Sequence, residues 1–341
     1  MKTLKNIYSN LYQHDTIRDV LTECLKDKKY RKEMLGRLEG DITYVQSCMG
    51  TFTFNKKETH QVIIRDRKKE RTITISPYFP NKIFDYLVIA PLKPMIKKSM
   101  YRWNVGNVEG RGKDMGIQFL YSHIKGYKYA IKLDVKKFYD NIDKKILFKL
   151  IKRKVSDSDF LRMYEEVIGT TGKGLDLGLN SSQWLANYYL QGLDYFIKQE
   201  LKAEVYVRYV DDMIILGNNK RKLHYFIRAI NQYLKEKLNL KLKENYALLN
   251  LEKGESVEFV GYKISHKGIQ LIKPLFHKFI RLYKRMKDMS KRRAKTLVAL
   301  WGWFKATTGS YAYYISHLRD TIMFSEVKRL LRRTTTWHQN S

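Results

Sequence analysis

Three aspartates lie where carboxylates could hold metal ions. Asp211 and Asp212 fall inside the apolar, β-branched run YVRYVDDMIIL (206–216), and Asp134 ends a second such run, YAIKLD. A carboxylate among apolar residues is costly unless a partner compensates its charge, and a metal ion is one such partner. Mg²⁺ prefers oxygen ligands and typically takes one or two carboxylates plus substrate phosphates. The three aspartates therefore predict a site for two Mg²⁺ ions of the kind that stabilises phosphoryl transfer.

The spacing of the aspartate pair constrains the backbone around it. Neighbouring side chains of a strand point to opposite faces, so Asp211 and Asp212 can share a site only if the chain turns there. Aspartate favours turns, and the flanking Val, Ile and Tyr residues favour strands. We expect a tight hairpin at the pair, with Asp134 on an adjacent strand. A lone Asp-Asp pair would more often be an ordinary surface turn, but here further motifs accompany it.

The segments around these aspartates alternate between helical and strand patterns. Strand patterns flank a basic turn within 51–80 and also occur in the two runs that carry the aspartates. A further hairpin is expected at 257–271. Helical spacing is found in residues 1–50, in 81–126 around a glycine-bearing loop, in a long helix over 181–201, in an amphipathic helix over 220–238, and from about 275 onward. The mixture predicts an α+β fold.

Composition indicates a globular protein with a polyanionic partner. Apolar residues make up 44% of the 341 residues, and 66 Lys and Arg against 34 Asp and Glu leave a formal net charge of +32. Nucleic acid is the partner that this charge favours, ahead of an anionic membrane surface. No run of 18 apolar residues or signal-peptide pattern is present. Cys24 and Cys48 form neither a disulfide framework nor a zinc pattern, which favours the reducing cytoplasm.

Four segments, in order, resemble the motifs of reverse transcriptases. KLDVKKFYDNID resembles the first aspartate motif of the palm, and KGLDLGLNSSQWLANYYLQGLD the motif that contacts template and nucleotide. YVRYVDD resembles the catalytic motif, and EFVGYKIS the primer-grip hairpin. The resemblance covers about residues 60–270. It implies a right-hand polymerase with an antiparallel palm sheet and a basic helical thumb. The implied domains are an N-terminal helical extension (1–50), fingers with part of the palm (51–126), palm (127–272) and thumb (273–341).

The resemblance also implies a reaction and roles for residues. The reaction is RNA-templated DNA synthesis with two Mg²⁺ ions, an RNA template, an RNA/DNA heteroduplex and dNTPs. Asp134 and Asp211 would be the principal metal ligands, together with Val135, and Asp212 would complete the catalytic triad. Tyr139 would be the aromatic steric gate that disfavours a 2′-OH; the alternative is an ordinary core aromatic.

Other residues are assigned to the nucleotide and the nucleic acid. Arg71, in an element resembling R-x-I-x-x-P, would contact the triphosphate, and Lys243 would protonate the leaving pyrophosphate, although Lys241 is equally basic. Contacts with nucleic acid are expected from Arg65, Lys69, Arg111, Lys113, Tyr209, Gly261, Lys291, Arg292 and Arg293. For the basic hairpin tip the alternative is simple solvation, and for the tryptophans of the thumb packing is the preferred reading.

The middle motif narrows the subgroup. Leu177, Gly178 and Gln183 belong to an LGxxxSQ pattern, which resembles the reverse transcriptases of diversity-generating retroelements. Other bacterial enzymes have glutamine where Leu177 stands, and the loss of an amide should weaken discrimination between bases. This subgroup implies error-prone copying at template adenines and a small basic pentameric accessory protein. The alternatives are an antiviral defence or retron-like reverse transcriptase that copies a dedicated noncoding RNA, and a non-catalytic RNA-binding scaffold.

Overall fold

The chain folds into two compact units, each built from discontinuous segments. The computed structural model describes residues 3–26, 28, 30–66, 69–285, 290–308, 327 and 331, without the side chains of 66, 69, 291 and 305. The first unit, here called the helical unit, combines Met1–Arg102, Val135–Leu201 and Ile227–Lys243. The second, the sheet unit, combines Trp103–Asp134, Lys202–Phe226 and Glu244–Ser341.

The helical unit is organised around α5 (Ile83–Ile89). This helix is apolar on nearly every side and packs against α2, α10 and α11, as a fully buried helix must. Its other elements are α1 (Ile7–Leu11), α2 (His14–Leu25), α3 (Arg31–Leu35), α4 (Leu38–Thr51), β1 (His60–Asp66), β2 (Lys69–Ile75), η1 (Tyr78–Lys82), η2 (Ala90–Leu92), α6 (Lys93–Ser99), α8 (Phe138–Asn141), α9 (Lys144–Lys152), α10 (Ser158–Ile168), α11 (Asn180–Tyr189), α12 (Gln191–Tyr195) and η3 (Phe196–Glu200). Helix α13 (Lys220–Leu238) contributes its C-terminal part.

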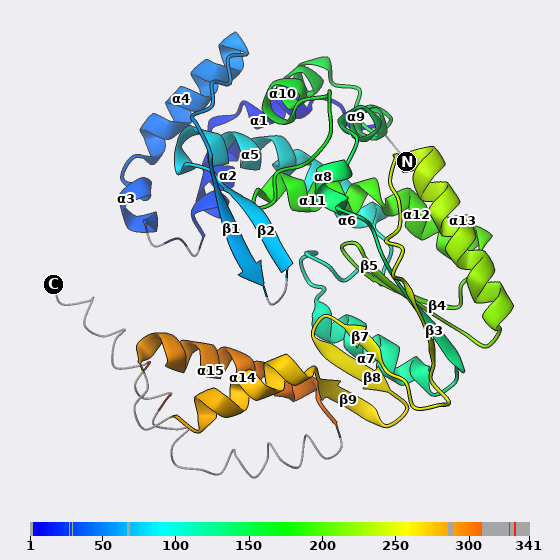
Figure 1. Ribbon diagram of the computed structural model, residues 1–341. Coiled ribbons are helices and arrows are strands. Elements are labelled where there is room, and N and C mark those ends of the chain that lie inside the picture. Colours follow the sequence, from blue (N-terminus) through cyan, green and yellow to red (C-terminus); the bar gives the residue numbers. More distant parts are fainter. Residues whose placement is uncertain are drawn as a thin grey trace. The chain divides into compact units, whose positions relative to one another are not determined.

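Local chemistry explains where several of these elements begin and end. Asp143 and Asp157 cap α9 and α10 by accepting hydrogen bonds from backbone N–H groups of the first turn. The long helix expected over 181–201 is interrupted at Leu190, whose φ of −87° and ψ of 0° separate α11 from α12. The expected strand–turn–strand of 51–80 is the antiparallel β1–β2 hairpin, which Figure 1 shows as two blue arrows.

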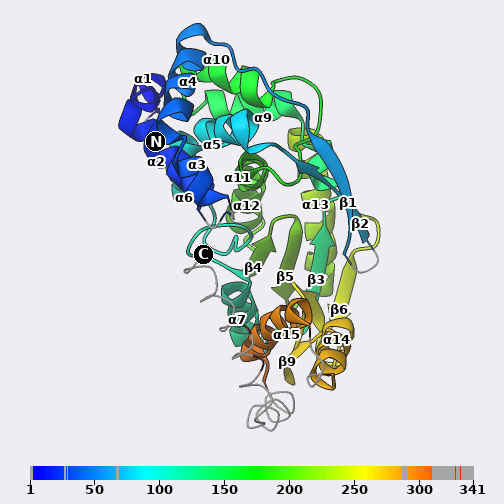
Figure 2. The ribbon, with the colours of Figure 1, turned by 90° about the vertical axis from the view of Figure 1, so that its left-hand side faces the viewer.

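In the described part of the sheet unit, the strands form two antiparallel sheets. The first has the order β4-β5-β3-β6, formed by β4 (Val205–Tyr209), β5 (Asp212–Gly217), β3 (Tyr129–Asp134) and β6 (Ala247–Asn250). Figure 2 shows β4, β5 and β3 side by side. The second sheet joins β7 (Val257–Phe259), β8 (Tyr262–Ser265) and β9 (Gly268–Leu271), so the expected hairpin has a third strand. The helices of this unit are α7 (Lys113–Ile124), α14 (Lys273–Tyr283), α15 (Lys291–Trp303) and η4 (Phe304–Ala306), with the first residues of α13.

One hydrophobic core joins these elements of the sheet unit. Val207 of β4, Ile117 of α7, Phe259 of β7, Phe279 of α14 and Leu297 of α15 are all fully buried in it. The core fixes the aspartate-bearing strands and the second sheet within one unit. Among the described residues, no helix combines the length and the apolar character needed to cross a bilayer.

Candidate active site

The antiparallel register of the first sheet brings the aspartates together. Asp134, the last residue of β3, is directly opposite Asp212, the first residue of β5. Asp212 is also opposite Tyr209 at the end of β4, so Val210 and Asp211 form the connecting turn. The expected hairpin is therefore present, with Asp211 in the turn and Asp212 already in the strand. Asp134, Asp211 and Asp212 therefore lie at the same end of the sheet.

The turn adopts a strained backbone that buried neighbours hold in place. Val210 has a φ of +58°, a region that β-branched residues rarely occupy. The fully buried guanidinium of Arg208 donates a hydrogen bond from Nη1 to the carbonyl of Val210, over 2.8 Å. The backbone of Arg208 also pairs with Trp103 and Val105, which run alongside β4. A charge-assisted hydrogen bond from a buried arginine strongly restricts the conformation of a tight turn.

The glycine-bearing loop supplies the space that this turn requires. A Cβ atom at Gly106 would overlap the backbone nitrogen of Val210, so no larger residue fits there without moving the turn. The side chain of the fully buried Asn104 accepts a hydrogen bond from the Gly106 N–H, over 3.4 Å. Sequence reasoning missed the roles of Arg208, Asn104 and Gly106. The one available signal was an arginine inside an apolar strand, which has to find a buried partner.

Negative charge accumulates at this end of the sheet. The pKa of Asp211 is raised to about 7, first by burial and then by the neighbouring Asp134, which acts both through its charge and as a hydrogen-bond partner. The charge of Asp212 raises the pKa further, and a backbone hydrogen bond opposes the shift. Lys132, two residues before Asp134, places its Nζ 3.3 Å from Oδ2 of Asp212. A cation bound between Asp134 and Asp211 would relieve the repulsion that the burial enforces.

The donor set fits Mg²⁺ if other oxygens complete the coordination. Among the described residues, no three His, Cys, Asp or Glu side chains converge closely enough to hold a metal ion alone. Mg²⁺ needs less than this, because one or two carboxylates suffice when substrate phosphates and water supply the rest. Val135 has a buried side chain and pairs with Leu242 through an isolated bridge, so it could offer a metal only its carbonyl oxygen.

In the helical unit, the LGxxxSQ segment lies against the β1–β2 hairpin. The carbonyl of Leu177 accepts a hydrogen bond from the backbone N–H of Thr74 in β2, over 2.8 Å. Gly178 has a φ of +116°, and a Cβ atom there would lie 2.7 Å from the carbonyl oxygen of Thr74. Gly178 is thus required both by its backbone conformation and by the close approach of β2. Leu177 is half-buried, with no amide to offer a nucleotide.

Asp85 fixes the start of the helix that follows this segment. This buried residue of α5 accepts hydrogen bonds from the backbone N–H groups of Asn180 and Ser181, and from the Ser181 hydroxyl. Burial raises the pKa of Asp85, and these hydrogen bonds oppose the rise. Sequence reasoning missed this carboxylate because its partners lie about ninety-five residues away along the chain.

The remaining nucleotide-site candidates also belong to the helical unit. Tyr139 is half-buried in α8, where its carbonyl accepts a hydrogen bond from the Leu175 N–H over 2.9 Å. Gln183 is exposed on the first turn of α11, and Arg71 is exposed on β2 opposite Ile64. Lys243 is half-buried just beyond the end of α13.

Several predicted nucleic-acid contacts already have partners within the protein. Nζ of Lys113 lies 3.2 Å from the ring centroid of Trp303, a cation–π contact, and burial lowers the pKa of this lysine. Trp303 also covers Gly261, where a Cβ atom would overlap its ring, and it stacks on Tyr262. The expected packing role of Trp303 is confirmed. A contact between Lys113 and nucleic acid would require the ammonium to leave the ring.

Other predicted contacts are more accessible. Arg65 is exposed and forms an ion pair with Glu70 over 2.8 Å, and Arg111 donates a 3.5 Å hydrogen bond to the carbonyl of Asn104. Tyr209 is half-buried, with its ring edge-on to Phe259. Two further candidates, Arg292 and Arg293, are exposed on α15, whereas the side chains of Lys69 and Lys291 lie outside the described residues.

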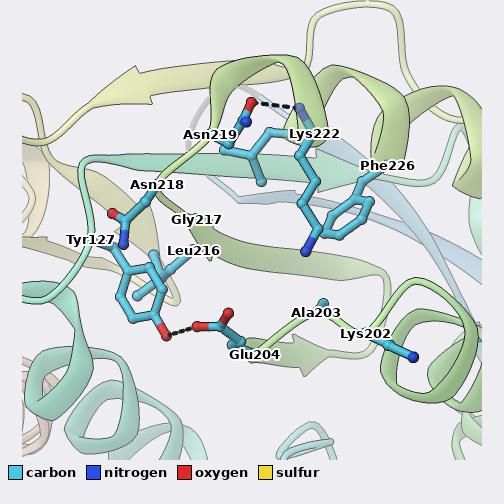
Figure 3. Close-up of a pocket in the computed structure, with 11 residues that line it drawn as sticks. Tyr127, Lys202, Ala203, Glu204, Leu216, Gly217, Asn218, Asn219, Lys222 and Phe226 are labelled. Carbon is cyan, nitrogen blue, oxygen red and sulfur yellow. Dashed lines mark hydrogen bonds between the residues drawn. The ribbon is translucent and has the colours of Figure 1, made fainter.

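A cavity of about 150 Å³ lies at the opposite end of β5 from Asp212. Figure 3 shows Tyr127 in its wall donating a hydrogen bond to Glu204, and Lys222 extending beside Phe226. None of the three aspartates lines this cavity. The candidate active site is therefore the aspartate end of the sheet, which is defined by side-chain chemistry rather than by the depth of a pocket.

Comparison with known proteins assigns the fold. The family model described as reverse transcriptase (RNA-dependent DNA polymerase) matches residues 55–264, a range that includes all three aspartates. The retron Ec73 reverse transcriptase of Escherichia coli is 26% identical over 179 residues, which are 47% of this chain and 52% of that protein.

Telomerases are among the similar solved structures. Apo telomerase from Candida tropicalis has a TM-score of 0.50 at 14% identity, over 73% of this chain and 57% of that one. Telomerase from Candida albicans with the TWJ fragment of telomeric RNA has a TM-score of 0.49 at 11% identity, over 79% and 54%. The matches thus span about half the length of these relatives. The expected fold class, a right-hand polymerase with mixed helices and antiparallel sheet, is confirmed.

Proposed function

Because the chain belongs to the reverse transcriptase (RNA-dependent DNA polymerase) family, we propose that it synthesises DNA on an RNA template. The observation that carries this proposal is the register that sets Asp134 opposite Asp212 and beside the Asp211 turn. The 3′-OH of a primer attacks the α-phosphate of a dNTP, a phosphodiester bond forms and pyrophosphate leaves. The substrates are the RNA template, the growing RNA/DNA heteroduplex and dNTPs.

The family normally uses divalent metal ions, and we assign Mg²⁺ to this site. Asp134 and Asp211 would hold the ions, with Asp212 and the Val135 carbonyl completing the protein's share of oxygens. Two Mg²⁺ ions, when bound, stabilise the charge on the attacking and leaving oxygens. Arg208 and Gly106 keep the Asp211 turn in the one conformation that presents its carboxylate beside Asp134.

The nucleotide is bound by residues of the family's remaining motifs. Tyr139 serves as the steric gate against a 2′-OH, and Arg71 contacts the triphosphate. Lys243 protonates the leaving pyrophosphate. Gly178 and Gln183 belong to the segment that contacts the templating base pair, and Asp85 supports that segment from α5. The turn between β7 and β8, which contains Gly261, is the primer grip, while Tyr209, Arg65, Arg111, Arg292 and Arg293 contact the nucleic acid.

Substitution of the aspartates tests the reaction. Asp211→Ala or Asp212→Ala should lower dNTP incorporation on a primed RNA by about a thousandfold or more, because each removes charge from the metal site. RNA binding, measured by filter retention, should stay nearly unchanged. Asp157→Ala is the matched control, since it removes an aspartate away from this site, which caps α10 and accepts a hydrogen bond from the Tyr8 N–H. If Asp211→Ala still incorporates dNTPs, the metal assignment is refuted. If the wild type binds RNA but incorporates no dNTP, the protein is a non-catalytic scaffold.

Within the family, we propose the diversity-generating type, in which copying is error-prone at template adenines. Leu177 carries this proposal, because its side chain offers no amide to the templating pair. Sequencing the cDNA made on a defined RNA should show errors concentrated opposite adenines, and Leu177→Gln should reduce them. Accurate copying by the wild type would contradict the assignment. A small basic pentameric accessory protein is the partner expected for this type.

A retron-like or antiviral defence role is the second candidate, and the similarity to the retron Ec73 enzyme favours it. Such an enzyme would copy a dedicated noncoding RNA faithfully. The same cDNA sequencing separates the two, since a defined, accurate product from one RNA identifies the retron-like activity.

A further inference from the structure

The side chain of Lys132 contacts two parts of the sheet unit at once. Its Nζ lies 3.3 Å from Oδ2 of Asp212 and donates a 2.6 Å hydrogen bond to the backbone carbonyl of Glu258. Asp212 begins β5 in the first sheet, whereas Glu258 is in β7 of the second. The lysine side chain is 30% exposed and that of Asp212 is 24% exposed, so the ion pair between them is partly shielded from solvent, whereas Glu258 is exposed.

The register of the strands makes this double contact possible. Lys132 and Asp134 point to the same face of β3, because they are two residues apart. Lys132 pairs with Ile214 and Asp134 with Asp212, so Asp212 is the diagonal neighbour of Lys132. A lysine side chain is long enough to reach a diagonal neighbour, and its ammonium has three donors. One donor can therefore face the carboxylate while another faces the carbonyl.

The second contact lies at the base of a turn. Glu258 is followed by Phe259, the last residue of β7, and then by Val260 and Gly261, both with positive φ. Val257 and Phe259 are fully buried, so the strand cannot slide along its axis without disturbing the core. The ammonium of Lys132 donates a charge-assisted hydrogen bond to the carbonyl of Glu258, which lies between Val257 and Phe259. This bond links β7 to β3.

We propose that Lys132 is a positioning residue that couples the β7–β8 turn to the catalytic aspartates. The inference rests on the proposed function, in which this turn holds the primer. The two contacts of Lys132 hold the β7–β8 turn at a fixed distance from the proposed metal-binding carboxylates within the sheet unit. A lysine that only neutralised Asp212 would alter the Mg²⁺ requirement of the enzyme and leave the binding of the primer unchanged.

The test compares two substitutions of this lysine with one of a neighbour. Lys132→Met keeps an unbranched side chain but removes the ammonium and its donors, whereas Lys132→Arg keeps charge and donors. Lys128→Met is the matched control, because Lys128 precedes the same strand and its ammonium forms a surface ion pair with Glu252 over 3.5 Å. The first measurement is the Kd of a primer–template duplex by fluorescence anisotropy in EDTA. The second is hydrogen–deuterium exchange of peptides covering 257–265, which requires neither metal nor catalysis.

Lys132→Met should weaken primer–template binding by about tenfold, the effect of losing one charged hydrogen bond, and should speed exchange across 257–265. Lys132→Arg and Lys128→Met should both stay within about twofold of wild type in Kd. A wild-type Kd for Lys132→Met, or exchange as slow as in the wild type, would overturn the inference. If Lys132→Met melts early, the comparison of exchange is made below its transition, with Lys132→Arg as the folded reference. Failure of the wild type to extend a primer would instead refute the proposed function.

Discussion

Asp211, a proposed metal ligand, combines a rigid support with an unfavourable local charge. Its turn is held by the buried guanidinium of Arg208, and its pKa is raised to about 7 by burial and by Asp134 and Asp212. An ordinary surface aspartate would be ionised whether or not a metal were present. A pKa of about 7 leaves Asp211 partly protonated near neutral pH, so a divalent ion bound there would compete with the proton.

We predict that the metal-free protein loses stability as pH rises from about 4 to about 7. The folded-state pKa of Asp211 exceeds its ordinary value of 3.8, so between the two values the folded chain binds more protons than the unfolded chain. The check is the Tm in EDTA from pH 4 to pH 8, with Asp211→Asn as the control, because asparagine does not titrate. Between pH 4 and pH 7, the Tm of the wild type should fall relative to that of Asp211→Asn. Parallel Tm profiles would contradict the raised pKa of Asp211.

Divalent ions should reverse this pattern. Mg²⁺ binds the ionised carboxylates, so adding it should raise the Tm of the wild type more at pH 8 than at pH 6. The increase should be absent in Asp211→Asn combined with Asp134→Asn. Equal increases at both pH values would show that the bound ion does not displace the proton of Asp211.

At the scale of elements, close backbone contacts position both the aspartate end of the sheet and the LGxxxSQ segment of the helical unit. In the sheet unit the 103–106 segment runs beside β4, and Gly106 allows the backbone of Val210 to approach. In the helical unit, Gly178 allows the same kind of approach to Thr74 of β2. The glycines of these loops therefore serve the packing of neighbouring segments, in addition to any contact with phosphate.

A pair of glycine substitutions in one loop tests this point. Gly106→Ala should lower stability by about 1–3 kcal/mol, the usual cost of overpacking, and reduce primer extension because the Asp211 turn must shift. Gly112→Ala should change stability by no more than about 0.5 kcal/mol, since nothing lies within 4 Å of the added methyl group and its φ is −164°. Chemical denaturation measures both, and equal effects would mean that the contact at Gly106 yields without cost.

At the scale of the whole molecule, charge is the dominant property. The net charge of +32 is spread over a chain whose proposed substrate is a polyanion. Binding of a primer–template should therefore be driven largely by release of counterions from phosphates, and its affinity should depend steeply on salt.

We predict that affinity for an RNA/DNA duplex falls by about a thousandfold between 50 and 200 mM salt, as expected for roughly six or more phosphate contacts. Fluorescence anisotropy at a series of salt concentrations measures the slope. Substituting the exposed Arg292 and Arg293 of α15 by glutamine should make the slope shallower by about two, whereas the Asp157→Ala control should leave it unchanged. A flat dependence in the wild type would argue against a phosphate-gripping surface.

The sequence alone was enough to propose the catalytic carboxylates and to identify the hairpin at the aspartate pair, most helices and strands, and the family. These follow from residue type, local periodicity and motifs. It did not reveal β6, the interruption at Leu190, or the partners of Arg208, Gly106, Lys132 and Asp85. Those features depend on contacts between residues far apart along the chain: Lys132 and Glu258 are separated by 126 positions. Periodicity states which face of a strand a side chain occupies, but only the tertiary fold decides which atoms meet it there. The proposed chemistry therefore follows from composition and motifs, whereas the geometry that it requires is set by register and packing.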